Sequence, residues 1–331
     1  MIKSFVRKTL VTAAVVLCGV AGMSSPASAG TISIGHTTWV GYGPLFVARE
    51  LGYFKQAGLD VQLTTIEESS MYMAAMASNK LSGTASTIDE ILKYRNSQFC
   101  FRSVLALDES AGGDGIVVAK GIQSMKDLKG KPVAVNEGSV SMFWLSYLLK
   151  KAGMGIKDID VKNMTADDAA SAFMAGRVPA AVTWEPNLTM VKQKKAGTVM
   201  VDSRQTPGVI VDVVALRCDV IDKQPADVRA LVEGVNKAVA YMKAHPAESA
   251  KIIAKGVGGY LSKPEDVSEA LKGVRFFDTQ GSIALLGQPG KPGPIKDVVS
   301  LANDTWSQLQ GKQLKVTYDD LVDTRFLKPA H

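Results

Sequence analysis

The feature that most constrains the fold is the alternation of short β-rich runs with segments of helical periodicity, which continues from residue 31 to residue 216. The first pair is a strand at Thr31–His36 followed by a helix at Pro44–Ala57, with Pro44 in the first helical turn where its missing N–H costs nothing. Alternation of this kind is typical of α/β domains in which helices cover largely parallel sheets.

The pairs fall into two sets, with a first crossing near residues 107–113. A last strongly apolar strand, 209–216, follows the second set, and the rest of the chain reads as mainly helical. A chain that leaves one lobe, builds a second and returns makes a two-segment hinge, which permits closure on a ligand. We predict a two-lobed α/β protein with an inter-lobe cleft: lobe one over 30–108, lobe two over 109–211, and a return segment with C-terminal helices over 212–331.

The N-terminal segment has the three parts of a secretory signal peptide. Lys3, Arg7 and Lys8 give a positive start, residues 10–20 are mostly apolar, and Ala27-Ser28-Ala29 supplies a small-x-small cleavage signal. The apolar run is shorter than the roughly 20 residues that span a bilayer, which argues against a membrane anchor. We predict export, with cleavage after Ala29.

Charge and cysteine content exclude several classes of protein. Removing the three basic residues of the signal segment leaves 38 − 3 = 35 basic against 32 acidic side chains, a net charge of +3. No run of Lys and Arg is interleaved with aromatics, so nucleic acid is not an expected partner. With three histidines and no CxxC or HExxH motif, neither a metal nor a cofactor is expected. Cys100 and Cys218 can form a disulfide in an oxidising compartment, or Cys218 can be a small buried residue; the sequence leaves both open.

Four stretches carry a family resemblance. Ile34–Leu59 (IGHTTWVGYGPLFVARELGYFKQAGL) contains an A-x-E-x-G-x-F-x-x-x-G-L phrase, and KDLKGKPVAVNEG begins at Lys126. Ala175–Pro186 (AGRVPAAVTWEP) and Ser203–Val213 (SRQTPGVIVDV) follow in the same order. Together they resemble bacterial periplasmic solute-binding proteins of the nitrate/sulfonate/taurine type. The resemblance implies two α/β lobes, a small-molecule ligand, a location in the periplasm, and an ABC permease with its ATPase at the inner membrane as partners of a monomeric binding protein.

Ligands of open α/β sheets bind beyond the carboxyl ends of the strands. In lobe one, Thr38, Trp39 and Tyr42 follow the first strand, and their neighbouring glycines let a ligand approach the backbone. Thr87 and Asp89 open a helix after a later strand, where they can bind a ligand or cap the helix. We predict all five as ligand-binding residues; the alternative for the two aromatics is packing between loop and helix.

In lobe two, Glu137 and Ser139 open a helix whose free N–H groups suit an anion, and the resemblance implies an oxyanion such as a sulfonate there. Trp184 and Glu185 end a strand predicted to be buried, where a carboxylate is costly unless it has a partner. The resemblance implies that the acid of this triplet faces a ligand amine. The alternatives are an ordinary serine cap, and a salt bridge between Glu185 and a hinge Lys or Arg.

Acidic residues mark both crossings. Asp108 lies at the first and Asp212 lies within the apolar strand of the second, so the pair can neutralise a cationic ligand, although solvated hinge acids would look the same. No Lys or Arg occupies the positions expected to face the ligand. The pattern favours an amine, amidine or zwitterion over a simple anion such as nitrate.

The sequence thus predicts a non-enzymatic binding protein that delivers an amine-bearing, taurine-like solute to an importer. An alkanesulfonate or nitrate ligand is the first alternative, and a periplasmic sensor domain is another. An enzyme resembling thiamin-pyrimidine synthases is disfavoured, because those enzymes need a Cys-rich segment and an active-site His.

Overall fold

The computed structural model describes Met1, residues 30–258 and residues 261–328. The predicted signal peptide therefore lies outside the described residues apart from Met1. Within the described part of the chain, no helix combines the length and the apolar character needed to cross a bilayer.

Lobe one is built on a six-stranded sheet with the order β11-β4-β10-β3-β1-β2. Strand β1 pairs in parallel with β2 and β3, whereas β10 runs antiparallel to β3 and β4, so the returning segment lies in the middle of the sheet. The strands are β1 (Gly30–His36), β2 (Leu59–Thr65), β3 (Gly83–Thr87), β4 (Phe101–Ser110), β10 (Val211–Arg217) and β11 (Val274–Phe276).

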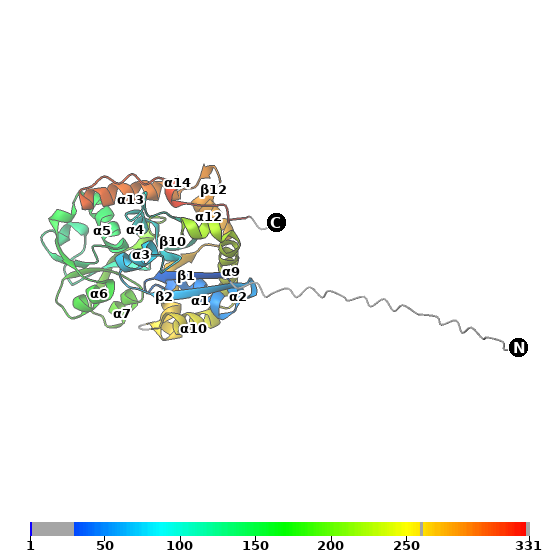
Figure 1. Cartoon of the computed structure of the whole chain (residues 1–331). Helices are drawn as coiled ribbons and strands as arrows, with labels where there is room; N and C mark the ends of the chain where they lie inside the picture. Colours follow the sequence, from blue (N-terminus) through cyan, green and yellow to red (C-terminus); the bar gives the residue numbers. More distant parts are fainter. Residues whose placement is uncertain (2–29, 259–260, 329–331) are drawn as a thin grey trace.

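Helices cover both faces of this sheet (Figure 1). Those before the first crossing are α1 (Gly43–Glu50), α2 (Tyr53–Gln56), α3 (Ser69–Ala77) and α4 (Ile88–Leu92). Those after the return are α8 (Cys218–Lys223), α9 (Pro225–Ala244), α10 (Pro246–Val257), α11 (Pro264–Ala270), α12 (Thr279–Leu286), α13 (Ile295–Gln310) and α14 (Tyr318–Leu321).

Lobe two is built on a separate five-stranded sheet with the order β7-β6-β8-β5-β9. Its strands are β5 (Asp114–Val118), β6 (Pro132–Val135), β7 (Asp160–Asn163), β8 (Ala180–Trp184) and β9 (Thr198–Asp202), and its helices are α5 (Val140–Lys151), α6 (Ala166–Met174) and α7 (Asn187–Gln193). Figure 1 shows α6 and α7 at one end of the molecule and β1, α1 and α9 at the other, while α13 runs along one side and contacts both α4 and α5. The predicted two-lobed α/β fold is confirmed; the lobe limits at 108/109 and 211/212 stay a prediction.

The long helix α9 illustrates how the sequence pattern produces the packing. Val228, Leu231, Val235 and Val239 recur at helical spacing and are all buried, giving one apolar stripe that faces α1 and the sheet. Gly234 lies beside that stripe, where an added Cβ would be 2.4 Å from the Phe54 ring. The missing side chain is therefore what lets α2 approach α9.

Three elements differ from the sequence-based expectation. The helix predicted over 44–57 is broken at Gly52, whose φ of +73° belongs to the left-handed region and separates α1 from α2. The C-terminal part, expected to be mainly helical, also contains strands. Helix α11 ends at Ala270, and Val274–Phe276 pairs with β4. A small hairpin follows further on, formed by β12 (Gly287–Gln288) with β13 (Lys291–Pro292).

The two segments of lobe one are joined covalently. Cys100 and Cys218 form a disulfide between residues 118 apart in sequence, with Cα atoms 5.4 Å apart. They flank the paired strands β4 and β10 at one end, and Asp108 and Asp212 face each other in register near the opposite end. The disulfide therefore fastens these two strands at the end remote from the two acids.

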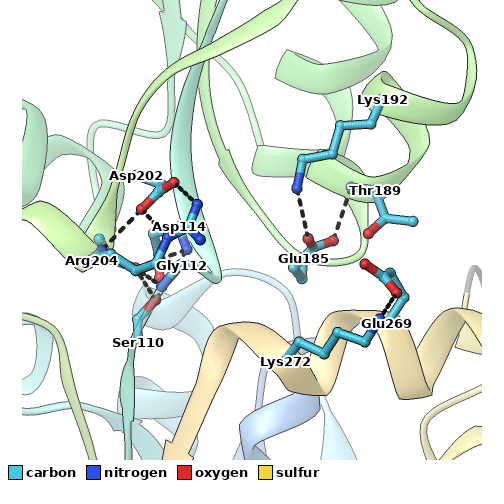
Figure 2. Close-up of polar contacts among 11 residues, drawn as sticks. Ser110, Gly112, Asp114, Glu185, Thr189, Lys192, Asp202, Arg204, Glu269 and Lys272 are labelled. Carbon is cyan, nitrogen blue, oxygen red and sulfur yellow. Dashed lines mark hydrogen bonds and ion pairs between the residues drawn. The ribbon is translucent and has the colours of Figure 1, made fainter.

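The two chain crossings between the lobes are also joined, by hydrogen bonds. Ser203 accepts from the backbone N–H of Gly112 at 2.7 Å and lies 2.8 Å from the Ser110 hydroxyl oxygen. Ser110 in turn accepts from the backbone N–H of Asp114 at 3.0 Å. Figure 2 shows this cluster, with Asp202 and Arg204 paired beside it. The outgoing and returning strands thus lie side by side where they pass between the lobes.

Candidate ligand-binding site

A small cavity of about 30 Å³, partly open to solvent, lies between the lobes. Roughly 10–15 Å³ on this measure holds one water molecule, so the space suits only a very small ligand. Lobe one and its return strand contribute Thr37, Trp39, Tyr42, Glu67, Ser69, Ser86, Thr87, Glu90 and Asp212, and lobe two with its return crossing contributes Asp114, Asn136, Ser139, Val140, Trp184 and Ile210.

Six of the predicted site residues line this cavity together: Trp39, Tyr42, Thr87, Ser139, Trp184 and Asp212. The other five do not line it. Thr38 lies at the rim, where its hydroxyl donates to Glu67 at 2.6 Å, and Glu137 is exposed. Asp89 and Asp108 are fully buried next to lining residues.

The two aromatic residues after β1 are held by carboxylates. Trp39 donates from its indole Nε1 to Asp108 Oδ1 at 3.2 Å, and Tyr42 donates from its hydroxyl to Asp212 Oδ1 at 2.8 Å. Both aromatic side chains line the cavity, as predicted for ligand-binding residues. Both are also buried, as the alternative of packing between loop and helix would have it. Asp108 acts on the cavity through Trp39, whereas Asp212 faces it directly.

Burial changes the protonation of this acid cluster. Desolvation raises the pKa of Asp108 to about 8 and that of Asp114 to about 7, and it raises the pKa of Asp212 well above its usual range, with the neighbouring acids adding to the effect. Because these pKa values are higher than in the unfolded chain, the stability these groups contribute is fully present below about pH 4. It is lost as the pH rises through the folded pKa values, about 7 for Asp114 and about 8 for Asp108. A cation bound in the cavity would lower the pKa values of these carboxyl groups and so favour their ionised form.

Glu185 does not have the geometry predicted for it. Its carboxylate accepts from the backbone N–H of Thr189 at 2.9 Å and lies 3.9 Å from Lys192 Nζ. Figure 2 shows it turned toward these two residues of α7, and it is not among the cavity-lining residues. The arrangement resembles the alternative stated for Glu185, a salt bridge to a hinge Lys or Arg. The lysine, however, belongs to α7 and not to the hinge.

The start of α5 also differs from the prediction of a free anion site. Ser139 caps the helix by accepting from the N–H of Ser141 at 3.2 Å. The N–H of Val140 donates across the cleft to Glu90 Oε2 at 3.3 Å, and Tyr72 donates to Glu90 Oε1 at 3.0 Å. A protein carboxylate from lobe one therefore already occupies this helix N-terminus.

Sequence reasoning missed several lining residues. Glu67 and Ser69 follow β2, so the strand-end rule that selected Trp39 would also have found them. Asn136 directly follows β6, so the same rule would have predicted it as a lining residue. Glu90 read as a residue serving the helix dipole, and nothing local in the sequence indicates that it reaches the other lobe.

The lobes touch directly at the cavity. Trp184 donates from its indole Nε1 to the backbone carbonyl of Thr38 at 3.0 Å, and Ser69 donates to the carbonyl of Gly138 at 3.3 Å. Each contact joins a residue of lobe one to a residue of lobe two. The two lobes are therefore in direct contact around the cavity.

Gly41 is a sensitive position of the site, because an added Cβ would lie 2.1 Å from Trp39 Nε1 and 2.4 Å from Asp108 Oδ2. Gly41→Ala should displace the indole and weaken ligand binding at least about tenfold, consistent with the 1–3 kcal/mol cost of overpacking. Isothermal titration calorimetry with the ligand found by screening would measure this. Gly155→Ala is the matched control, since its Cβ meets nothing within 4 Å. Equal affinities for the two variants would contradict the role given to Trp39.

Comparison with known proteins agrees with this architecture. A Bacillus subtilis (strain 168) protein whose name assigns it to the binding of aliphatic sulfonates is 24% identical over 303 residues, covering 87% of this chain and 84% of that protein. The taurine-binding periplasmic protein of Escherichia coli (strain K12) is 23% identical over 236 residues, 70% of each chain.

Solved structures show the same fold. The ligand-binding component of an ABC-type import system from Staphylococcus aureus, with zinc bound, superposes with a TM-score of 0.72 at 15% identity, covering 91% of this chain and 99% of that one. The alkanesulfonate-binding protein SsuA from Xanthomonas axonopodis pv. citri, bound to MOPS, gives 0.68 at 16% identity, covering 86% and 94%. A family model described as NMT1/THI5 like matches residues 39–249, and the chain belongs to that family.

Proposed function

We propose that this chain is the substrate-binding protein of an ABC importer and that it captures a small amine-bearing solute in the inter-lobe cavity. It works in the periplasm as a monomer and delivers the solute to a permease and its ATPase at the inner membrane. The names of its relatives support the transport role, and the cysteine pair, joined as a disulfide, suits an oxidising compartment. The chain is a binding protein and not an enzyme.

One observation carries the choice of an amine. Four acidic side chains line the cavity, namely Glu67, Glu90, Asp114 and Asp212, and its lining within the described residues includes no Lys, Arg or His. Three of them, Glu90, Asp114 and Asp212, are buried. Buried acids that lack a cationic partner destabilise a fold, so their presence together favours a ligand that brings positive charge. Trp39 and Trp184 add aromatic walls, which also suit a cation.

The binding mechanism follows from residues that lie in different lobes. Asp212 belongs to lobe one, and Asp114 and Trp184 belong to lobe two, so a cation gains all of these contacts only when the lobes close. A ligand shifts a conformational equilibrium by its differential affinity for the two states. The solute therefore stabilises the closed form, which is the form a permease can distinguish from empty protein.

A thermal-shift screen tests the proposal. Amines, guanidines, amino-sulfonates, ureas, alkanesulfonates and nitrate would be compared at neutral pH. An amine-bearing hit present at 100 times its Kd should raise the free energy of unfolding by about 2.7 kcal/mol. A response to nitrate or a simple alkanesulfonate alone would overturn the amine assignment and favour the anion reading, which the names of the relatives support. No response to any class would remove the binding function.

A further inference from the structure

Four hydrogen-bond donors of the cavity lining are already used within the protein, three of them by its own carboxylates. The indole of Trp39 donates to Asp108, the hydroxyl of Tyr42 donates to Asp212, and the backbone N–H of Val140 donates to Glu90. The indole of Trp184 is used as well, by the carbonyl of Thr38. An acid group on the ligand would therefore have to displace a carboxylate to gain any of the first three donors, and the carbonyl of Thr38 to gain the fourth.

Among these carboxylates, Glu90 is the one that binds across the cleft to the other lobe. It belongs to α4 of lobe one, its side chain is only 5% exposed, and it reaches the N-terminus of the 12-residue helix α5 of lobe two. A helix N-terminus attracts negative charge through its free N–H groups and its dipole. In this chain that attraction is satisfied from within, because one carboxylate oxygen accepts from Val140 and the other from Tyr72.

A second observation concerns Thr87, whose side chain lines the cavity. Its buried hydroxyl lies beside the buried carboxyl group of Asp89 and meets no well-formed hydrogen-bond partner within the described residues. Buried polar groups are nearly always paired, so a hydroxyl in this position can bind a polar ligand atom, either as donor or as acceptor. The nearby cation Lys93 is not that partner, because its ammonium donates to the carbonyl of Gly138 and lies 4.1 Å from the Trp306 ring centroid.

We infer that Glu90 takes the place of the ligand's acid group, so that the cavity accepts a small organic cation without an acid group and excludes zwitterions such as taurine. This inference rests on the proposed function and narrows its ligand class. A sulfonate or carboxylate on the ligand would join four acidic side chains in a partly desolvated space, and like charges there repel strongly. The raised pKa values of Asp114 and Asp212 show that this space is already poor at holding negative charge.

Matched ligand pairs test the inference by isothermal titration calorimetry. Ethylammonium and taurine share an amine but differ by a sulfonate, and guanidinium and guanidinoacetate differ by a carboxylate. For the unmodified protein at pH 8, at least one cation should bind about tenfold or more tightly than its acid-bearing partner. Glu90→Ala frees the N–H of Val140 and the hydroxyl of Tyr72, so it should reduce or reverse that preference.

Two further variants keep the outcome decisive. Glu90→Gln retains the shape of the side chain and removes its charge. It should reduce the preference for the cation over its acid-bearing partner, even if the alanine variant fails to fold. Glu233→Gln removes an exposed acid of α9, which does not line the cavity, and should leave the preference unchanged. Tighter binding of taurine or guanidinoacetate by the unmodified protein would overturn the inference and leave the proposed function intact. Failure of every amine in the wider screen would instead overturn the proposed function.

Discussion

Asp212→Asn is expected to weaken binding of a cationic solute by about 30-fold or more. Asp212 lines the cavity, and its carboxylate accepts from Tyr42 at 2.8 Å, a bond that an amide oxygen can also accept. The variant therefore keeps the shape of the site and loses the charge. Removing one partner of a buried, hydrogen-bonded charge pair costs about 2–5 kcal/mol, which sets the expected loss of affinity. Calorimetric titration with the best cation from the screen would measure it.

The same substitution should not destabilise the ligand-free protein at pH 8. Burial raises the pKa of Asp212 well above its usual range, so ionising this group in the empty cavity opposes folding, and an uncharged amide avoids that effect. Thermal unfolding of both proteins would show it. Glu233→Gln is the control for affinity, since Glu233 is an exposed acid of the same lobe that does not line the cavity. An Asp212→Asn protein that binds the cation as tightly as the unmodified one would remove Asp212 from the site.

Affinity for a cation should also depend on pH in a defined direction. Asp114 lines the cavity, and its pKa is raised to about 7 by burial, with the charge of Glu185 adding to the rise. Below pH 7 the group carries a proton that a bound cation must expel. Each proton released weakens binding by up to about tenfold for every pH unit below the pKa. Titrations between pH 5.5 and 8.5 that gave a constant Kd would contradict this linkage.

Loss of the Cys100–Cys218 disulfide should be the largest single change in stability. It closes a loop that spans 118 residues of sequence separation and contains all of the lobe-two strands. A cross-link over a loop of this length removes enough freedom from the unfolded chain to contribute about 2–5 kcal/mol. The double variant Cys100→Ser, Cys218→Ser should show a correspondingly lower free energy of unfolding in guanidinium chloride.

Ligand affinity is the control for that experiment. The disulfide lies at the ends of β4 and β10 that are remote from Asp108 and Asp212, so the Kd of the folded double variant should change by less than about threefold. The unmodified protein in a reducing agent should lose stability to the same extent as the variant. A disulfide-free protein as stable as the oxidised one would show that the loop closure contributes nothing.

Much of the fold could be predicted because it depends on local patterns. The apolar strand β10 and the alternating strand–helix pairs are visible as periodicity, whereas β11 is only three residues long and exists through its pairing with β4. Helix α12 depends on Asp278, which caps it by accepting from Gly281, in a region without a strong apolar repeat. Short elements of this kind are fixed by tertiary contacts that a sequence window does not contain.

The site could be located but not resolved residue by residue. Strand ends gave Trp39, Tyr42 and Trp184, but the direction of each neighbouring side chain is a three-dimensional property. Trp184 ends β8 and lines the cavity, whereas Glu185 begins the turn into α7 and faces that helix. In the same way, Asp89 and Glu90 are adjacent on a helix, and only Glu90 projects into the cleft.

The paired crossings between the lobes determine what kind of motion is open to them. Because Ser203 binds both the Gly112 backbone and Ser110, the two strands at the hinge are held edge to edge. Two strand connections that lie side by side allow bending about one axis and resist twisting. Lobe two should therefore close along one path and reach the same alignment each time. Solutes of different shape would then be selected by one fixed cleft geometry, and not by a cleft that adapts to each solute.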